Sequence, residues 1–406
     1  MSEVAQVPQL RFPEFNGDLE EKKLDDVGSF KSGTGFTEAE QGGKSGVPFF
    51  KVSDMNLEGN QKVMVSANNY VNDEQIARLN YKPINKKSVI FAKVGAAVFL
   101  ERKRIADSFL IDNNMMAFTP TEDIDFIRQW FDTVRLSKYA QVGALPSYNA
   151  SDLKTIKINL PSLPEQTKIA NFLAAVDTKI EQLSKKQALL GEYKKGLMQQ
   201  IFSQATRFKA DDGSEFPDWE EKKLGGMIDI VVDNRGKTPP VVKERNIPLI
   251  EVNAIGSKSI DYKKVSKFVT PETFKNWFRK YLNNGDILFS TVGQTAVCSI
   301  YFDSVKAAIA QNIVGLRFSS EDFKFMYYLL TERKNNHKFK RIEMGAVQPS
   351  VKVSQMIHID FKIPSFPEQQ KIANFLSSID NKIEQVGKQL RESKQFKKAL
   401  LQQMFV

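Results

Sequence analysis

Only a few residues of this chain have the types and spacing that phosphate binding or methyl transfer would require. Gly42-Gly43-Lys44-Ser45 is similar to the end of a phosphate-binding loop, but that motif needs a glycine where the chain has Glu38. The run FKSGTG at 30–35 is similar to the glycine-rich loop of methyltransferases, yet no Asn-Pro-Pro-aromatic or Asp-Pro-Pro-aromatic motif occurs. We therefore expect no catalytic residue, and we interpret the run at 30–35 as a recognition loop.

Potential metal ligands are equally sparse. His337 and His358 are the only histidines and Cys298 is the only cysteine, so a four-ligand zinc site would need carboxylates. The run PDWEEK at 217–222 has the residue types of a nuclease metal site, but they are crowded into a polar linker. We expect no metal in this chain.

Cysteine content and hydropathy bear on the compartment. One cysteine allows no intrachain disulfide, which fits a reducing cytoplasm. The N-terminus lacks the basic start and apolar core of a secretory signal, and the most apolar run, 88–100, is too short to span a bilayer. These features predict a cytoplasmic protein with no membrane contact.

Length and charge indicate several domains and a polyanionic partner. The 406 residues exceed one typical domain, and 41% hydrophobic and 26% charged residues are an ordinary globular composition. Lys and Arg total 58 against 48 acidic residues, a net charge of +10. Such an excess favours nucleic acid as a partner, although a merely soluble basic protein is the alternative.

The chain contains one long internal repeat. LPSLPEQTKIANFL at 160–173 returns as IPSFPEQQKIANFL at 363–376, and EEKKL occurs at both 20–24 and 220–224. Two large copies indicate a pseudo-dimer, because solenoid repeats are shorter and more numerous. The helical segments are nearly alike while the domains between them differ. We expect the former to assemble the protein and the latter to read two different targets.

Each copy ends in a long segment with the apolar spacing of a coiled coil. The seam consists of Ile169, Leu173, Val176, Ile180, Leu183, Leu190, Leu197 and Ile201 in the first copy and of Ile372, Leu376, Ile379, Ile383, Val386, Leu390, Leu400 and Met404 in the second. It is interrupted at Gln187, Lys194, Ser393 and Lys397. Proline followed by glutamate predicts helix starts near 164 and 367.

We predict that the two helices pair as an antiparallel coiled coil with a pseudo-twofold axis, which would put one domain at each end of a rod. The alternative is that each helix packs only against its own domain.

The segments between the helices read as mixed α and β structure. VPFFKVS, SVIFAKV, IPLIEVN and DILFSTV predict short strands, and apolar spacing predicts helices at 122–138 and 321–336. The predicted fold class is α+β, with two mixed α/β domains joined by two long helices. The predicted boundaries are target-recognition domains at 1–159 and 206–362 and helical regions at 160–205 and 363–406.

With these features the chain resembles the specificity subunits of Type I restriction-modification systems over its full length. The resemblance rests on the two PEQ-containing helix starts and, in the second domain, on Arg235-Gly236-Lys237-Thr238-Pro239, IPLIEV, GDILFSTVG and AQNIVGL. It implies a non-catalytic DNA-binding subunit that directs two modification and two restriction subunits to a two-part, gapped site in double-stranded DNA. AdoMet, ATP and Mg²⁺ would belong to those partners.

We expect loop residues to contact the DNA, cations at phosphates and short amides or hydroxyls at base edges. The candidates in the first domain are Lys31, Ser32, Thr34, Lys51, Ser53, Asn56, Lys93, Asn113, Asn114, Ser147, Tyr148 and Asn149. Those in the second are Arg235, Lys237, Thr238, Asn253, Ser290, Thr291, Gln294, Gln311, Asn312, Gln348 and Ser350.

Two other functions compete with this one. A self-contained DNA methyltransferase or nuclease is disfavoured by the missing motifs, and a coiled-coil adaptor without DNA binding is disfavoured by the basic charge.

Overall fold

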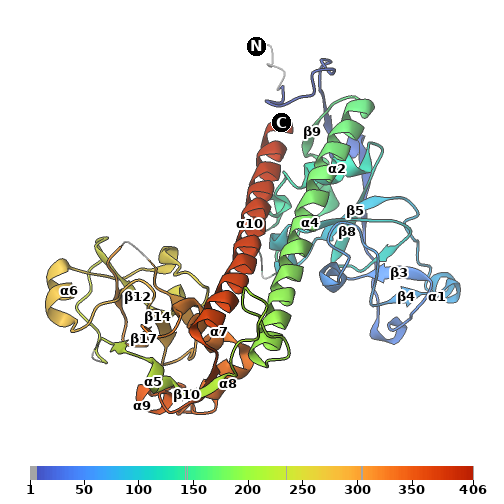
Figure 1. Ribbon diagram of the computed structural model, residues 1–406. Coiled ribbons are helices and arrows are strands. Elements are labelled where there is room, and N and C mark those ends of the chain that lie inside the picture. The colour runs from blue at the N-terminus through green and yellow to red at the C-terminus, as the bar shows by residue number, and fades with distance from the viewer. Residues whose placement is uncertain (1–6, 142, 144, 235, 303–304, 406) are drawn as a thin grey trace. The chain divides into compact units, whose positions relative to one another are not determined.

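The computed structural model describes residues 7–141, 143, 145–234, 236–302 and 305–405 (Figure 1). The chain divides into two compact units, unit 1 with Met1–Ser184 and Lys388–Val406 and unit 2 with Lys185–Gly387. The long helices α4 (Leu163–Phe202) and α10 (Phe366–Met404) each give one half to each unit. The predicted α+β repeat is thus present, because each unit combines one mixed domain with two helix halves.

The domain of unit 1 is built on three small sheets with strand orders β2-β8-β5-β6, β4-β3-β7 and β1-β9. All pairs are antiparallel except β3 with β7. The strands are β1 (Glu20–Lys23), β2 (Gly28–Ser32), β3 (Val47–Phe50), β4 (Tyr70–Val71), β5 (Ser88–Ala92), β6 (Lys103–Ala106), β7 (Leu110–Ile111), β8 (Met115–Pro120) and β9 (Lys157–Leu160). Three helices accompany them: α1 (Asp73–Arg78), α2 (Ile124–Phe131) and α3 (Ala150–Lys154).

The domain of unit 2 repeats this topology strand for strand, with orders β11-β17-β14-β15, β13-β12-β16 and β10-β18. Its strands are β10 (Glu220–Lys223), β11 (Ile230–Val232), β12 (Ile247–Ile250), β13 (Phe268–Val269), β14 (Ile287–Ser290), β15 (Cys298–Ile300), β16 (Ala308–Ile309), β17 (Ile313–Arg317) and β18 (Asp360–Ile363). Its helices are α5 (Leu224–Met227), α6 (Pro271–Trp277), α7 (Phe323–Thr331), α8 (Arg333–Lys340) and α9 (Val353–Met356). The four predicted strands are β3, β5, β12 and β14.

The two helices predicted inside the domains are wrong in extent. The first ends at Phe131, and a separate 3-10 turn, η5, covers Leu136–Tyr139. The second is broken at Glu332, whose ψ of 136° is extended and whose carboxylate accepts a hydrogen bond from Asn335 N at 2.9 Å. Glu332 therefore ends α7 and caps α8, an outcome that apolar spacing alone does not encode.

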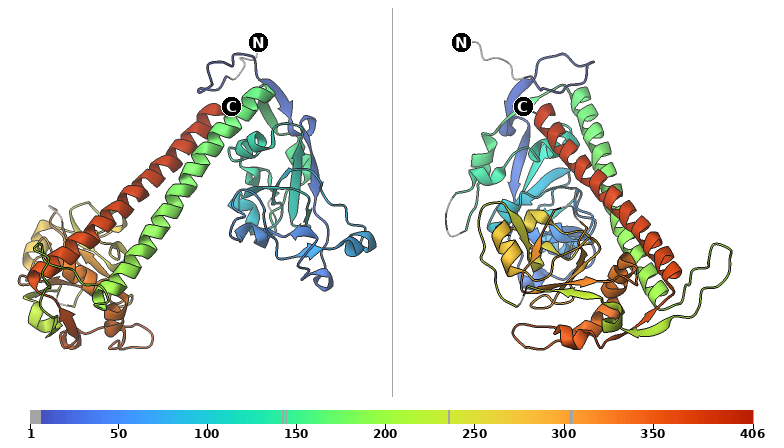
Figure 2. Two further views of the ribbon diagram at one scale, coloured as in Figure 1. Left: turned by 45° about the vertical axis from the view of Figure 1, so that its right-hand side comes forward. Right: turned by 60° about the vertical axis from the view of Figure 1, so that its left-hand side comes forward.

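The two long helices pair antiparallel within each unit, as predicted. In unit 1 the start of α4, with Ile169 and Leu173, shares a core with Leu400 and Met404 at the end of α10. In unit 2 Ile201 near the end of α4 shares a core with the start of α10. Figure 2 shows the ribbons of α4 and α10 lying alongside each other. Every seam residue is buried or half-buried. The first turns of each helix also pack on their own domain, so the two packing modes coexist rather than exclude each other.

Glutamate and glutamine of the PEQ motif fasten each helix start to its domain. In unit 1 the Arg11 guanidinium donates to the buried Glu165 carboxylate at 2.7 and 2.8 Å. Gln166 Nε2 donates to the Pro161 carbonyl at 3.0 Å, and Gln166 Oε1 accepts from Asp123 N at 3.2 Å. A buried carboxylate is stable only with such partners, so this arginine is part of the fold.

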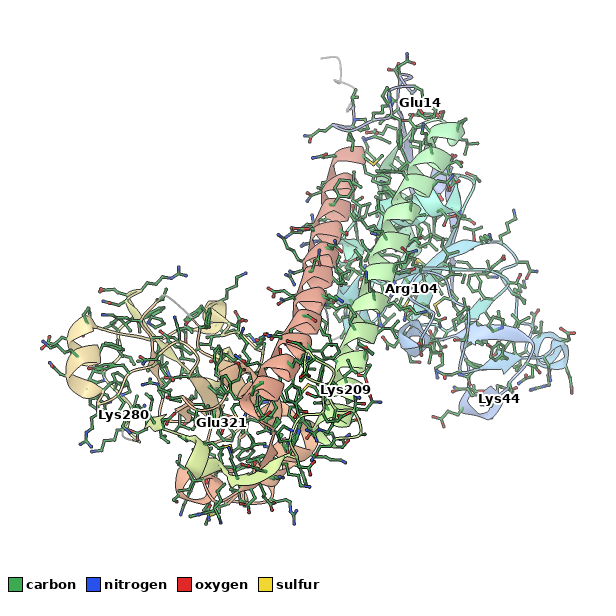
Figure 3. All side chains as sticks on the ribbon, viewed as in Figure 1. Glu14, Lys44, Arg104, Lys209, Lys280 and Glu321 are labelled. Atoms are coloured by element: carbon green, nitrogen blue, oxygen red, sulfur yellow. The ribbon has the colours of Figure 1, made fainter. Side chains whose placement is uncertain are left out.

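Unit 2 carries the same fastening. Arg207 donates to the buried Glu368 carboxylate at 2.8 Å, and Gln369 Oε1 accepts from Asp322 N at 2.9 Å. The Gln369 side chain also donates to Glu321, which is labelled in Figure 3. We call these two arrangements the PEQ clamps.

Two of the polar interruptions in the seam are ion pairs between the helices. Lys397 of α10 lies 2.8 Å from the Asp177 carboxylate of α4 in unit 1. In unit 2 Lys194 of α4 lies 2.6 Å from Asp380 of α10. Lys194 and Lys397 are equivalent positions of the repeat, and so are Asp177 and Asp380. Each seam lysine is therefore paired with the equivalent aspartate on the other long helix. Such a pair disfavours other helix registers.

Candidate nucleic-acid interface

Three loops of each domain meet beside the end of its central strand. In unit 1 the loop after β5 is joined to the turn before β8 by Lys93 N donating to Asn114 O at 2.8 Å. Gly95 N donates to Pro146 O at 2.8 Å and so holds the hairpin that Gln141 and Ser147 close. We call these three loops, 93–95, 112–114 and the described residues 141, 143 and 145–147, the first loop cluster.

The same bonds recur in unit 2. Thr291 N donates to Asn312 O at 2.8 Å, and Gly293 N donates to Pro349 O at 2.8 Å. Met344 and Ser350 close the corresponding hairpin. The loops 291–295, 310–312 and 344–350 form the second loop cluster.

The ends of two further strands join each cluster. Thr34 N donates to Ile111 O at 3.0 Å, and a Cβ on Gly33 would lie 1.8 Å from the Asp112 carbonyl oxygen, so this close approach requires glycine. Asp112 N donates to Phe50 O at 3.0 Å, which places Lys51 next to the same turn. In unit 2 the Thr238 hydroxyl donates to Gln311 Oε1 at 2.8 Å. Candidates from distant parts of the chain are therefore brought together.

Most of the predicted side chains are accessible. The exposed ones are Lys31, Ser32, Ser53, Asn56, Asn113, Asn114, Asn149, Lys237, Thr238, Asn253, Gln294, Gln311 and Gln348, and the half-buried ones are Thr34, Lys51, Lys93, Ser147, Asn312 and Ser350. Arg235 lies outside the residues that the structure describes. Ser53, Asn56 and Asn253 belong to 3-10 turns after β3 and β12 and make none of the bonds that join the clusters.

Three candidates are buried and have structural contacts instead. The Tyr148 side chain is 2% exposed and its hydroxyl donates to the Ala92 carbonyl. Burial raises the pKa of Tyr148 far above its usual range. Ser290 Oγ accepts from Val297 N at 2.9 Å, and Thr291 is also buried. A side chain that reads a base edge has to reach solvent, and these three do not. Their side chains therefore have a structural role in the loops.

Two ionisable groups in the first cluster have shifted pKa values. Burial, together with the neighbouring Lys82, lowers the pKa of Lys31, whose Nζ donates to the Lys82 carbonyl at 2.5 Å. Burial raises the pKa of Asp112, although hydrogen bonds from Asn114 oppose that shift. Asp112 therefore acts as a turn residue whose carboxylate is already engaged by Asn114, and the Lys31 ammonium group is held at the Lys82 carbonyl.

Exposed apolar residues at the hairpin tips are absent from the sequence-based prediction. Val347 is 100% exposed and Leu145 is 69% exposed, although both hairpins are fixed by backbone hydrogen bonds. Apolar side chains contact thymine methyl groups in the major groove. The similarity of GALPS and GAVQPS is the sequence signal for these tips, but a prediction from polar residue types does not include their apolar side chains.

The motif that is similar to a phosphate-binding loop has a different context. Gly43 O accepts from Tyr70 N at 3.1 Å, and strand β3, not a helix, follows Lys44 and Ser45. Figure 3 labels Lys44. Within the described ranges, no three His, Cys, Asp or Glu side chains gather closely enough to hold a metal ion. None of the helices formed by those same residues has the length and apolarity that crossing a membrane requires.

The repeated clusters and most of each long helix fall within two copies of a known domain. The family model of the Type I restriction modification DNA specificity domain matches residues 16–190 and again residues 217–392. The chain belongs to this family. Each copy of the specificity domain contains one loop cluster and much of the helix that follows it.

Two curated relatives come from Methanocaldococcus jannaschii. The Type I restriction enzyme MjaVIII specificity subunit is 29% identical over 270 residues, which are 63% of this chain and 63% of the relative. The putative type I restriction enzyme MjaX specificity subunit is 25% identical over 395 residues, 90% of this chain and 88% of the relative. Both relatives are thus named as specificity subunits.

Solved structures show the same fold. The S subunit of the Type I restriction-modification system from M. genitalium superposes with a TM-score of 0.59 at 15% identity and covers 99% of both chains. A chain from a structure titled for complex assembly and conformational transition of the type I R-M system gives 0.55 at 16% identity, covering 96% of this chain and 97% of the other. The architecture is therefore retained where sequence identity is low.

Proposed function

We propose that this chain is the non-catalytic specificity subunit of a Type I restriction-modification enzyme. Each loop cluster reads one half of a two-part DNA site, and the base pairs between the halves are not read. The observation that carries this proposal is that one loop cluster is built twice on identical topology with different exposed side chains.

The chemistry of the clusters suits a DNA groove. Lysines such as Lys31 and Lys237 are available for phosphates, and the amides of Asn113 and Gln311 can donate and accept at base edges. At one matched hairpin position the first cluster has Leu145 and the second has Gln348. An apolar group and an amide favour different bases, so the two halves of the site should differ in sequence.

The chemical steps would belong to other subunits. We propose that two modification subunits and two restriction subunits bind this chain and that AdoMet, ATP and Mg²⁺ are held by them. Membership of the specificity-domain family supports this assignment. We further propose that the assembly works in the cytoplasm, where chromosomal and incoming DNA are both accessible.

A methylation map tests the proposal. The chain is expressed together with its modification subunit in a host without DNA methylation, and modified bases are mapped across the genome. One two-part, gapped motif is expected. The reciprocal variants Leu145→Gln and Gln348→Leu should each alter the specificity of one half of that motif and leave the other half unchanged.

Other outcomes would contradict the proposal. An ungapped palindrome would exclude two different readers, and a change in both halves from one substitution would show that the clusters do not act separately. Methylation or cleavage by the purified chain alone would support a self-contained enzyme. DNA binding insensitive to sequence and salt would support an adaptor.

A further inference from the structure

Unit 2 carries a basic helix that has no counterpart among the described residues of the first domain. Asp123 caps α2 and Ser147 closes the hairpin of the first domain, and Ser147 lies 24 positions after Asp123. The corresponding residues of the second domain are Asp322 and Ser350, and Ser350 lies 28 positions after Asp322. The longer connection contains α8, with the sequence RKNNHKFK, where the first domain has only η5. The additional helix is therefore specific to one of the two domains.

One side of α8 borders an open hollow with a volume of about 570 Å³. Its lining consists of Gln199, Arg333, Lys334, Asn336, His337 and Lys340. This set provides a guanidinium, two ammonium groups, an imidazole and two amides, and it contains no carboxylate. Such a lining is suited to an anion with several acceptor oxygens.

Two of the three lysine and arginine side chains that line this hollow have no carboxylate partner among the residues that the structure describes. Lys340 is paired with Glu343 at 2.7 Å, but no ion pair or side-chain hydrogen bond is recorded for Arg333, Lys334 or His337 among the residues that the structure describes. All three side chains are exposed. Neighbouring positive charges repel each other, and a bound anion would remove that repulsion.

The hollow is attached to the second loop cluster. Asn336 Nδ2 donates to the Ala296 carbonyl at 2.7 Å, and Lys340 Nζ donates to Thr295 Oγ1 at 2.7 Å. Thr295 ends the loop 291–295, and Ala296, which follows, has a φ of 58°, a left-handed conformation that these contacts hold in place. The position of the cations is thereby fixed relative to the loop that carries Gln294.

We propose that the α8 hollow binds a backbone phosphate of DNA beside the half-site that the second domain reads. This inference rests on the proposed function. Arg333 and Lys334 neutralise the phosphate, and the amide of Gln199 donates to its oxygens. Asn336 holds α8 on the loop through the Ala296 and Leu330 carbonyls. Because phosphates carry no base identity, the hollow adds affinity and fixes register without changing the motif.

The test uses the full chain assembled with its modification subunit and a DNA duplex that contains the mapped motif. Arg333→Gln combined with Lys334→Gln removes two charges from exposed positions. The magnitude of the slope of log affinity against log salt should fall by about 1, because the one phosphate contact contributes about 0.9. Ethylation of one phosphate beside the second half-site should weaken binding by the unaltered chain and should have no further effect on the variant.

The matched control is Lys275→Gln combined with Arg279→Gln, which removes the same charge from exposed positions on and just after α6. Helix α6 lies apart from α8 within unit 2 (Figure 1). The control should keep the salt slope, and both variants should keep the methylation motif. An equal fall in slope for both variants would overturn the proposal, since it would reflect net charge alone.

Two further results would also overturn it. An unchanged slope with normal assembly would show that no phosphate binds there. Loss of the modification subunit with an unchanged slope would show that the hollow docks an acidic protein surface. Failure of the proposed function is distinguishable from failure of this inference. The proposed function would be contradicted if the unaltered chain gave no gapped methylation motif.

Discussion

Removing Lys397 should destabilise unit 1 because it leaves the Asp177 carboxylate in a partly desolvated site. The Asp177 side chain is 9% exposed and that of Lys397 is 15% exposed. Loss of one partner from a buried pair typically costs about 3 to 5 kcal/mol. Asp177 keeps Gln129 at 3.2 Å and the Arg128 guanidinium at 3.8 Å, so we expect Lys397→Met to cost about 3 kcal/mol.

The cost should depend on pH in a defined direction. Burial raises the pKa of Asp177, but hydrogen bonding and attraction from Lys397, with Gln129 and Lys62, lower it overall. A carboxyl group whose pKa is lower in the folded chain stabilises the fold above its unfolded pKa of about 3.9. This stabilisation disappears as the pH falls through the folded pKa. The difference between the original chain and Lys397→Met should therefore be largest at neutral pH and shrink in acid below about pH 4.

Fluorescence of Trp130 isolates the unfolding of unit 1, because the other tryptophans, Trp219 and Trp277, belong to unit 2 and can be replaced by phenylalanine in every variant. With a urea m-value of about 2 to 3 kcal/mol/M, a loss of 3 kcal/mol moves the midpoint by about 1 to 1.5 M. The control is Lys398→Met at the adjacent exposed position, which should change stability by less than about 0.5 kcal/mol.

The double variant separates the charge from the packing. Asp177→Leu with Lys397→Met removes both ions, and it should recover most of the stability because an apolar pair of similar volume often replaces a buried ion pair without loss. If Lys397→Met costs no more than the Lys398→Met control, the ion pair contributes nothing. If the double variant is no more stable than Lys397→Met, the unpaired carboxylate is not the cause.

Three other predictions concern unit 2. Arg207→Met leaves the buried Glu368 carboxylate without its guanidinium, and calorimetry should show a loss of about 3 kcal/mol, whereas a loss under about 1 kcal/mol would argue against the PEQ clamp. Burial raises the pKa of Cys298 to about 12, so Ellman's reagent at pH 8 should react with no thiol in the folded chain and with one in urea; rapid reaction of the folded chain would contradict this burial. Leu376→Ala should cost about 2 to 5 kcal/mol in urea unfolding because the side chain is fully buried, whereas Leu189→Ala, at a 60% exposed position, should be nearly neutral.

The helices could be predicted in position and pairing because their signal is local and periodic. Apolar residues three and four positions apart define a face, and that face is the one that Leu173 and Leu376 bury. The polar interruptions could not be interpreted from the same signal. The partner of Lys397 is Asp177, and nothing local to either residue indicates the other.

The PEQ motif was only partly understood from the sequence. Proline followed by glutamate predicts only a helix start at this place, whereas the structure shows Glu165 buried beneath Arg11. An Arg-Phe pair occurs at 11–12 and again at 207–208, and this repeated pair is the sequence signal for the clamps.

The sequence also leaves open which residues of the candidate site point toward solvent. Residue type and loop position placed Tyr148 among the DNA-reading groups, whereas the direction of its side chain depends on packing against β5.

The two copies of the repeat are alike in their PEQ clamps and helix ion pairs but differ at their hairpin tips. This difference implies that the recognition surface and the assembly surface can change independently. The PEQ clamps use the same residue types in both units, Arg11 with Glu165 and Arg207 with Glu368, and the helix pairs exchange equivalent lysines and aspartates. The hairpin tips differ although their backbone hydrogen bonds are the same. Because the tip side chains are exposed and contribute little to packing, substitutions there carry a small stability cost. On the proposed function, a change of DNA target is therefore accessible by mutation at the tips, whereas changes in the clamps or ion pairs need compensation by a partner elsewhere in the chain.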